Sequence, residues 1–123
     1  MKATILIVDD SPQLRGMLAA LLVEAGYDVI TADTYEHAKD EADYAEPDLL
    51  LIDIRLGEHN GLQLAIRERG MGRNRPLIVM SGHDDPVLVA EATRINARFV
   101  PKPIDTEHLL ALIKEMLGER ESP

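Results

Sequence analysis

Cysteine and tryptophan are absent from this 123-residue sequence, and phenylalanine occurs once. Without cysteine there is no disulfide framework and no thiolate chemistry, which fits a reducing compartment such as the cytoplasm. One Phe and three Tyr leave little aromatic surface for stacking on bases. No apolar run approaches the roughly 20 residues of a membrane span, and the four apolar residues before Asp9 are too few for a signal peptide. We therefore expect a cytoplasmic chain that is neither exported nor anchored in a membrane.

Basic residues are also scarce, since 13 Lys and Arg face 22 Asp and Glu, for a net charge of −9. This charge repels a phosphate backbone, so we expect no direct binding to nucleic acid. The one basic cluster is predicted to be a solvated loop and not a docking patch; it comprises Arg67, Arg69, Arg73 and Arg75. A content of 46% hydrophobic and 28% charged residues is typical of one globular domain.

Five short apolar runs, bounded by Asp, Gly, Asn or Pro, alternate with five segments of helical spacing. The runs predict β-strands, at Thr4–Val8, Val29–Ala32, Leu49–Ile52, Leu77–Met80 and Arg98–Val100. The clearest helix begins at Ser11 as N-cap, with Pro12 at its first position, and ends near Gly26. The others are predicted at Tyr35–Ala45, Gly61–Arg69, Pro86–Ile95 and Leu109–Leu117. This alternation predicts an α/β fold, a single doubly wound parallel sheet covered by helices on both faces. The polar run at 28–31 is best suited to an edge.

Ionisable residues follow three of these runs. Asp9 and Asp10 follow the first, Asp53 follows the third, and Lys102 comes soon after the fifth. Open parallel sheets bind ligands at the carboxyl ends of their strands, so these side chains are expected to share one crevice. Each has a simpler interpretation alone: the acidic pair could cap a helix, Asp53 could be a loop acid, and Lys102 could be solvated. Gathered together, three carboxylates need a cation, and Mg²⁺ is the usual choice.

In this order and spacing, the residues of these strand ends resemble a response-regulator receiver domain, a CheY-like module of two-component signalling. The resemblance runs from the first strand to the last helix and is carried by Asp9, Asp10, Asp53, Gly61, Ser81, Phe99 and Lys102-Pro103. It implies the flavodoxin-like strand order 2-1-3-4-5 with five helices. It also implies a signalling switch that catalyses its own phosphorylation and dephosphorylation and has no separate substrate, so not an enzyme in the usual sense.

The resemblance assigns roles to these residues. Asp53 would accept a phosphoryl group from a phosphohistidine of a sensor histidine kinase or phosphotransfer protein. Mg²⁺ would be held by Asp10, Asp53 and the backbone carbonyl of Arg55, with Asp9 acting through water. Ser81 and Lys102 would contact the phosphoryl oxygens, and Ser81 with Phe99 would form the switch that alters the face of the fourth helix, fifth strand and fifth helix. A downstream target, or a second copy of the chain, would bind that face.

The sequence departs from the family pattern after Asp53. Leu56 and Gly57 stand where receivers often carry Met-Pro, and because Gly lacks proline's fixed φ, the loop is expected to be more flexible. Arg55 and His83 occupy positions that in this family influence the lifetime of the phosphoryl group. Val87 and Leu110 lie outside the core stripes of their helices, which marks them as either a partner surface or ordinary exposed apolar residues.

Two other functions remain open from the sequence. A Mg²⁺-dependent phosphohydrolase also uses an Asp nucleophile at a strand end, but usually needs a second Asp where Arg55 stands. A receiver-like interaction module that is never phosphorylated is the other alternative. We expect the receiver domain at 1–118 and a C-terminal tail at 119–123, as a stand-alone regulator or as a receiver excised from a longer one.

Overall fold

A five-stranded parallel sheet forms the centre of the molecule. The structure is a computed structural model and describes residues 2–82 and 86–118. Its strand order is β2-β1-β3-β6-β7, which is 2-1-3-4-5 for the five strands in chain order and confirms the prediction. The polar strand β2 lies at one edge, also as predicted. The strands are β1 Thr4–Val8, β2 Asp28–Ala32, β3 Leu49–Asp53, β4 Arg55–Leu56, β5 His59–Asn60, β6 Leu77–Ser81 and β7 Arg98–Pro101. The helices are α1 Pro12–Glu24, α2 Tyr35–Ala45, α3 Gly61–Gly70, α4 Pro86–Arg94 and α5 Thr106–Met116.

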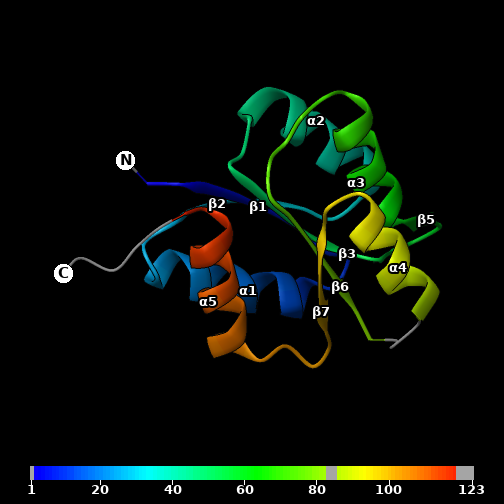
Figure 1. The fold of residues 1–123 in the computed structure, drawn as a ribbon. Coiled ribbons are helices and arrows are strands. Elements are labelled where there is room, and N and C mark those ends of the chain that lie inside the picture. The colour runs from blue at the N-terminus through cyan, green and yellow to red at the C-terminus, as the bar shows by residue number, and fades with distance from the viewer. Residues whose placement is uncertain (1, 83–85, 119–123) are drawn as a thin grey trace.

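The helices cover both faces of the sheet, with α1 and α5 on one side and α2, α3 and α4 on the other (Figure 1). Successive strand residues point to opposite faces, so each strand serves two cores. In β1, Leu6 and Val8 belong to the core with α2, α3 and α4, whereas Ile5 and Ile7 belong to the core with α1 and α5. All four are fully buried, which explains why this strand is a continuous apolar run.

The predicted beginning of α1 is confirmed. The Ser11 hydroxyl accepts a hydrogen bond from the backbone N–H of Leu14 at 3.3 Å, and Pro12 is the first helical residue. This cap satisfies one of the amide donors that a helix leaves unpaired at its N-terminus, and proline loses no hydrogen bond there. The helix therefore begins directly after the two carboxylates at the end of β1.

Between β3 and α3 the chain forms a small antiparallel hairpin that the sequence analysis did not predict. In this hairpin Arg55 pairs with Asn60 and Leu56 with His59. Its two-residue turn is Gly57-Glu58, where Gly57 has a φ of +60° and Glu58 does not have a positive φ. Glycine with a positive φ at the first central position is the pattern of a type II′ turn, which suits the twist of a hairpin. The loop that was expected to be more flexible is thus a paired element.

The prediction of a solvated basic loop at Arg67, Arg69, Arg73 and Arg75 is wrong. Arg73 and Arg75 both donate to Glu68, whose side chain is fully buried. Arg67 and Arg73 donate to Asp43 on α2 at 2.9 and 2.8 Å.

The Arg69 side chain donates hydrogen bonds to four backbone carbonyl oxygens, those of Ile95, Asn96, Arg73 and Arg75. The guanidinium groups therefore tie α2, α3 and the segment after α4 to the loop before β6, because each presents several donors in a fixed plane.

The two apolar residues that were predicted to lie off the core stripes differ in the structure. Val87 on α4 is 65% exposed, as predicted. Leu110 on α5 is half-buried. Because it packs against the core on its face of the sheet, its predicted position outside the core stripe is only partly right. Within the described ranges, no helix is long and apolar enough to cross a membrane. His83 and the tail at 119–123 lie outside the described residues.

Candidate functional site

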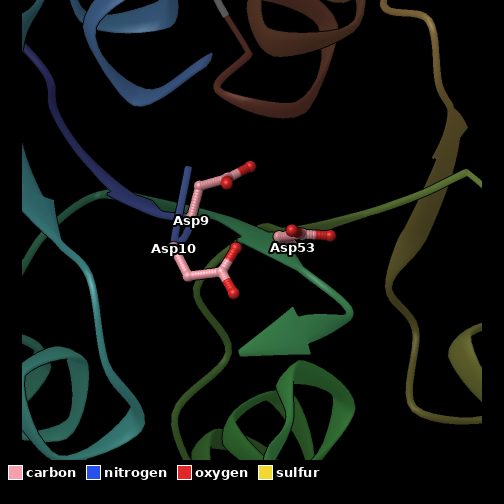
Figure 2. Close-up of side chains that lie close together, drawn as sticks. All are labelled: Asp9, Asp10 and Asp53. Carbon is pink, nitrogen blue, oxygen red and sulfur yellow. The ribbon is translucent and has the colours of Figure 1, made fainter. Parts of the chain in front are cut away.

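Three carboxylates meet at the carboxyl ends of β1 and β3. These strands are neighbours in parallel register, with Val8 opposite Ile52, so the residues that follow them emerge at the same edge of the sheet. Figure 2 shows Asp9 and Asp10 projecting from the end of β1 beside Asp53. One oxygen from each of the three lies within 4.8 Å of the others. The crevice expected from the sequence is therefore present.

Asp9 and Asp10 are adjacent in the chain but lie in different environments. Asp9 is fully buried, and its Oδ1 accepts the backbone N–H of Ser11 at 2.8 Å. Arg15 donates from Nη1 to the Asp9 carbonyl at 2.8 Å, which fixes the backbone at the start of α1. Asp10 is exposed, and its Oδ2 accepts the backbone N–H of Gly57 at 3.3 Å. Asp10 is therefore the more accessible of the two carboxylates.

Asp53 is the buried carboxylate at the end of β3, with only 4% of its surface exposed. Its Oδ1 accepts the backbone N–H of Arg55 at 3.3 Å, and its Oδ2 lies 3.2 Å from Nζ of Lys102. Burial raises the pKa of Asp53 above its ordinary value, and the nearby charge of Asp9 raises it further, while Lys102 opposes both effects. The carboxylate of Asp53 therefore holds a proton more readily than a solvated aspartate does.

Lys102, directly after the edge strand β7, supplies a positive charge to the site. Its Nζ lies 3.5 Å from Oδ2 of Asp9 as well as 3.2 Å from Asp53, so one ammonium lies between two carboxylates. The Lys102 side chain is 25% exposed, which leaves it accessible from the crevice. Its backbone N–H donates to the carbonyl of Ser81 at 2.8 Å, which joins the ends of β7 and β6. Ser81 itself is buried, with 4% of its surface exposed.

Two further residues named from the sequence, Phe99 and Arg55, lie in β7 and β4. Phe99 is half-buried in β7, where it pairs in register with Val79. Arg55 begins β4, and its side chain is exposed while its backbone N–H contacts Asp53. His83, which was predicted to influence phosphoryl lifetime, lies outside the described residues.

Gly61 allows α3 to begin directly beside the end of β3. A Cβ atom at this position would lie 1.9 Å from the carbonyl oxygen of Asp53 and 2.8 Å from Cγ2 of Ile52. The Gly61 N–H also donates to the carbonyl of Ile54 at 2.6 Å. Glycine is needed here because of this close backbone approach and not because of an unusual φ. Gly61 therefore fixes the backbone that presents Asp53.

The hairpin is the part of the site that sequence reasoning missed. Gly57 contacts Asp10 through its N–H, and Asn60 caps α3 by accepting the N–H of Leu62 at 2.8 Å. A Gly-X dipeptide is a recognised signal for a two-residue hairpin. Strands of two residues, however, are too short to produce a detectable alternation of apolar and polar positions.

The donor set of the crevice fits a hard divalent cation. Asp9, Asp10 and Asp53 offer carboxylate oxygens within 4.8 Å of one another, and Asp10 is open to solvent. Mg²⁺ prefers such oxygens and keeps several of its waters, which an open site permits. The three carboxylates therefore fit the expected magnesium site in type of ligand.

Comparison with known proteins assigns the chain to a family. The family model of the response regulator receiver domain matches residues 5–114. The chain belongs to this family. It is thus a CheY-like receiver domain of two-component response regulators, a signalling module and not a conventional enzyme, and the acidic triad is typical of a receiver magnesium site. The phosphohydrolase alternative is therefore set aside.

The receiver domain is similar to parts of longer regulators. Two-component response regulator PprB from Pseudomonas aeruginosa is 34% identical over 113 residues, which cover 87% of this chain and 41% of PprB. Transcriptional regulatory protein GlrR from Escherichia coli is 30% identical, over 98% of this chain and 27% of GlrR. The chain therefore spans less than half the length of these two curated relatives. A CheY-like receiver domain protein from Methanospirillum hungatei has a similar structure, with a TM-score of 0.91, 25% identity and coverage of 96% of this chain and 95% of that one.

Proposed function

We propose that Asp53 is the phosphoacceptor of this receiver domain and that its phosphorylation switches a partner-binding surface. The observation that carries the proposal is the placement of Asp53, a buried carboxylate 3.2 Å from the ammonium of Lys102 and grouped with Asp9 and Asp10. The donor would be a phosphohistidine of a sensor histidine kinase or phosphotransfer protein, in the cytoplasm. Membership of the family supports a kinase partner in general.

The transfer is an in-line displacement at phosphorus. An oxygen of Asp53 forms the new bond to phosphorus as the bond to the histidine nitrogen breaks, and the electron pair of that bond returns to the imidazole. Such a reaction needs positioning and neutralisation of spread negative charge more than covalent help from the protein. Lys102 supplies one positive charge at a fixed distance from the nucleophile. Ser81, at the end of the adjacent strand, is proposed to donate its hydroxyl to a phosphoryl oxygen.

The proposed magnesium ligands are Asp10, Asp53 and the backbone carbonyl of Arg55, with Asp9 acting through water. When bound, the ion neutralises charge on the phosphoryl oxygens. The buried Asp9 is suited to an indirect role, since its two oxygens already contact the N–H of Ser11 and the ammonium of Lys102. Exposed Asp10 is suited to direct binding.

For the output, we propose the face formed by α4, β7 and α5, called here the α4–β7–α5 face. Ser81 would move toward the phosphoryl group and Phe99 would follow, which changes this face. Val87, 65% exposed on α4, is its most accessible large apolar residue among those described. A downstream target or a second copy of the chain would bind there. If so, Val87→Glu should abolish association that depends on phosphorylation while leaving phosphorylation itself intact.

We propose the domain boundaries 1–118 for the receiver and 119–123 for the tail; the family match to residues 5–114 supports a receiver over most of the first range. The relatives PprB and GlrR are each more than twice as long as the segment that matches this chain. Whether the reading frame continues past Pro123 distinguishes a stand-alone regulator from an excised receiver.

The phosphoacceptor is tested by intact mass after incubation with acetyl phosphate and Mg²⁺. We expect a single phosphoryl adduct on the wild type and none on Asp53→Asn. Asp40→Asn, an exposed change on α2, is the matched control and should be phosphorylated normally. If folded wild-type protein gains no adduct while an unrelated active receiver does, the proposal fails and the unphosphorylated interaction module takes its place.

A further inference from the structure

Gly57, in the turn of the β4–β5 hairpin, stands where receivers often carry proline. Gly57 has a φ of +60°, whereas proline is restricted to a φ near −65°. Proline also has no N–H, so it could not make the 3.3 Å hydrogen bond from Gly57 to Asp10. Both the type II′ turn and this hydrogen bond therefore depend on a departure from the usual receiver pattern.

The β4–β5 hairpin contacts two of the three carboxylates. Its first residue, Arg55, donates its N–H to Oδ1 of Asp53 at 3.3 Å. Gly57, directly after its second residue, donates to Oδ2 of Asp10 at 3.3 Å. A rotation or displacement of the hairpin would therefore change the separation of Asp10 and Asp53, and Mg²⁺ demands a near-ideal octahedral arrangement of its ligands.

The hairpin is held against α2 by an aromatic contact. The ring of His59, on β5, stacks on the ring of Tyr35, the first residue of α2, with centroids 5.0 Å apart and an interplanar angle of 23°. Tyr35 is half-buried and packs against the core on that side of the sheet, so it is a firm support. Opposite His59 in the hairpin, Leu56 is buried. Both rings also line a groove of about 400 Å³ that reaches Asp10.

We propose that Tyr35 and His59 are positioning residues for the magnesium site. By holding β5 against α2, the stacked pair orients β4, and β4 in turn fixes Asp10 and Asp53 at a separation suited to the ion. Neither residue is among the proposed ligands. The inference rests on the proposed magnesium site and adds to it a support that the family pattern around Asp9, Asp10, Asp53 and Lys102 does not include.

The test measures the dissociation constant for Mg²⁺ alone, by isothermal titration calorimetry on the full 123-residue chain. Tyr35→Ala and His59→Ala should each weaken Mg²⁺ binding about threefold, within the range that an aromatic pair can contribute to an equilibrium constant. The double variant should be no weaker than either single variant, because both remove one shared contact. Tyr35→Phe and His59→Phe retain a stacked ring and should bind Mg²⁺ with the wild-type dissociation constant.

Exposed residues of the same types provide controls. Tyr44 lies on the same helix as Tyr35 and is 88% exposed, and His108 is exposed on α5. Tyr44→Ala and His108→Ala should therefore leave Mg²⁺ binding unchanged. Acetyl phosphate labelling adds a second readout: the Ala variants at Tyr35 and His59 should need more Mg²⁺ for half-maximal rate yet approach the wild-type rate at saturating Mg²⁺.

The outcomes separate this inference from the proposed function. Folded Ala variants at Tyr35 and His59 that bind Mg²⁺ with the wild-type constant overturn the positioning role and leave the magnesium site intact. A lowered saturating rate with an unchanged Mg²⁺ requirement also overturns it. Wild-type protein that binds no Mg²⁺ overturns the magnesium site itself. Thermal unfolding of each variant establishes that it is folded.

Discussion

Replacing Gly61 with alanine tests how tightly α3 is fitted against the end of β3. The added Cβ would lie 1.9 Å from the carbonyl oxygen of Asp53, whereas real Cβ atoms keep at least 3.0 Å from such atoms, so the two backbones must separate by about 1.1 Å. The obstacle is backbone and not a flexible side chain, so a rotamer change cannot relieve the clash. We expect a loss of about 3 kcal/mol in the free energy of unfolding, at the upper end for overpacking.

Thermal unfolding followed by circular dichroism measures this loss. For a chain of this size, it should lower Tm by roughly 12 °C. The same displacement moves the backbone of Asp53, and an error of about 1 Å in the placement of a nucleophile can slow a reaction on the order of a hundredfold. Phosphorylation by acetyl phosphate should therefore be much slower in the Gly61→Ala variant, even at temperatures at which the variant is folded.

Gly16 provides the matched control. It lies in the exposed interior of α1, and a Cβ there meets no atom within 4 Å. Gly16→Ala should therefore stabilise the protein by about 0.5 to 1 kcal/mol, because alanine loses less backbone entropy in a helix. A Gly61→Ala variant with wild-type Tm and wild-type phosphorylation rate would refute the argument that the close approach of α3 positions Asp53.

Four other changes test separate parts of the structure. Glu68→Ala removes the buried partner of two arginines and should lower the free energy of unfolding in urea by about 3 to 5 kcal/mol. Glu115→Ala, which removes an exposed ion pair at 3.9 Å, should change the free energy of unfolding little. Equal losses in the two variants would contradict a stabilising role for the buried network. Because the pKa of Asp53 is raised in the folded protein, its ionised form opposes folding. Asp53→Asn should therefore stabilise the protein relative to the wild type, and increasingly so as the pH rises from about 4. A difference in the free energy of unfolding that does not change with pH would refute this. Hydrogen bonds from two arginines lower the pKa of Asp43 to about 2. Ionised Asp43 should therefore stabilise the fold above pH 3.8, by about 1 kcal/mol or less for an exposed group, and this contribution should disappear as the pH falls toward 2. The free energies of unfolding of the wild type and Asp43→Asn, compared across this pH range, measure it. Arg55→Ala should shorten the lifetime of the aspartyl phosphate if the exposed arginine shields it electrostatically, and equal hydrolysis rates would exclude that role.

The elements of the main sheet could be predicted because their signals are local. The apolar run at Thr4–Val8 matches β1 in full, since a strand buried on both faces needs no alternation of polar and apolar residues. Ser11 and Pro12 together define where α1 begins. Once the strands are parallel neighbours, the convergence of Asp9, Asp10 and Asp53 follows from the topology, and so the main site could be predicted as well.

The arginine network could not be predicted, because its partners are set by tertiary structure. Glu68 precedes Arg75 by seven residues, and Asp43 belongs to another helix, so no local spacing relates them. In sequence, clustered charges of this kind are usually solvated. Only the packing of α2 against α3 shows that Glu68 is fully buried and needs cationic partners. The same limit applies to the Tyr35–His59 stack, whose rings are 24 positions apart in the chain.

Gly57 illustrates how the same chemical fact can support opposite structural conclusions. Freedom from proline's fixed φ predicts a looser loop if the glycine is considered alone. With a turn of two residues and a buried Leu56 beside it, that freedom instead permits the +60° φ that closes a hairpin. The closed hairpin then directs the Gly57 N–H to Asp10, an interaction that the proline common in this family would prevent. The glycine after Asp53 therefore ties the hairpin to the acidic edge of the sheet through a contact with Asp10 that local sequence does not encode.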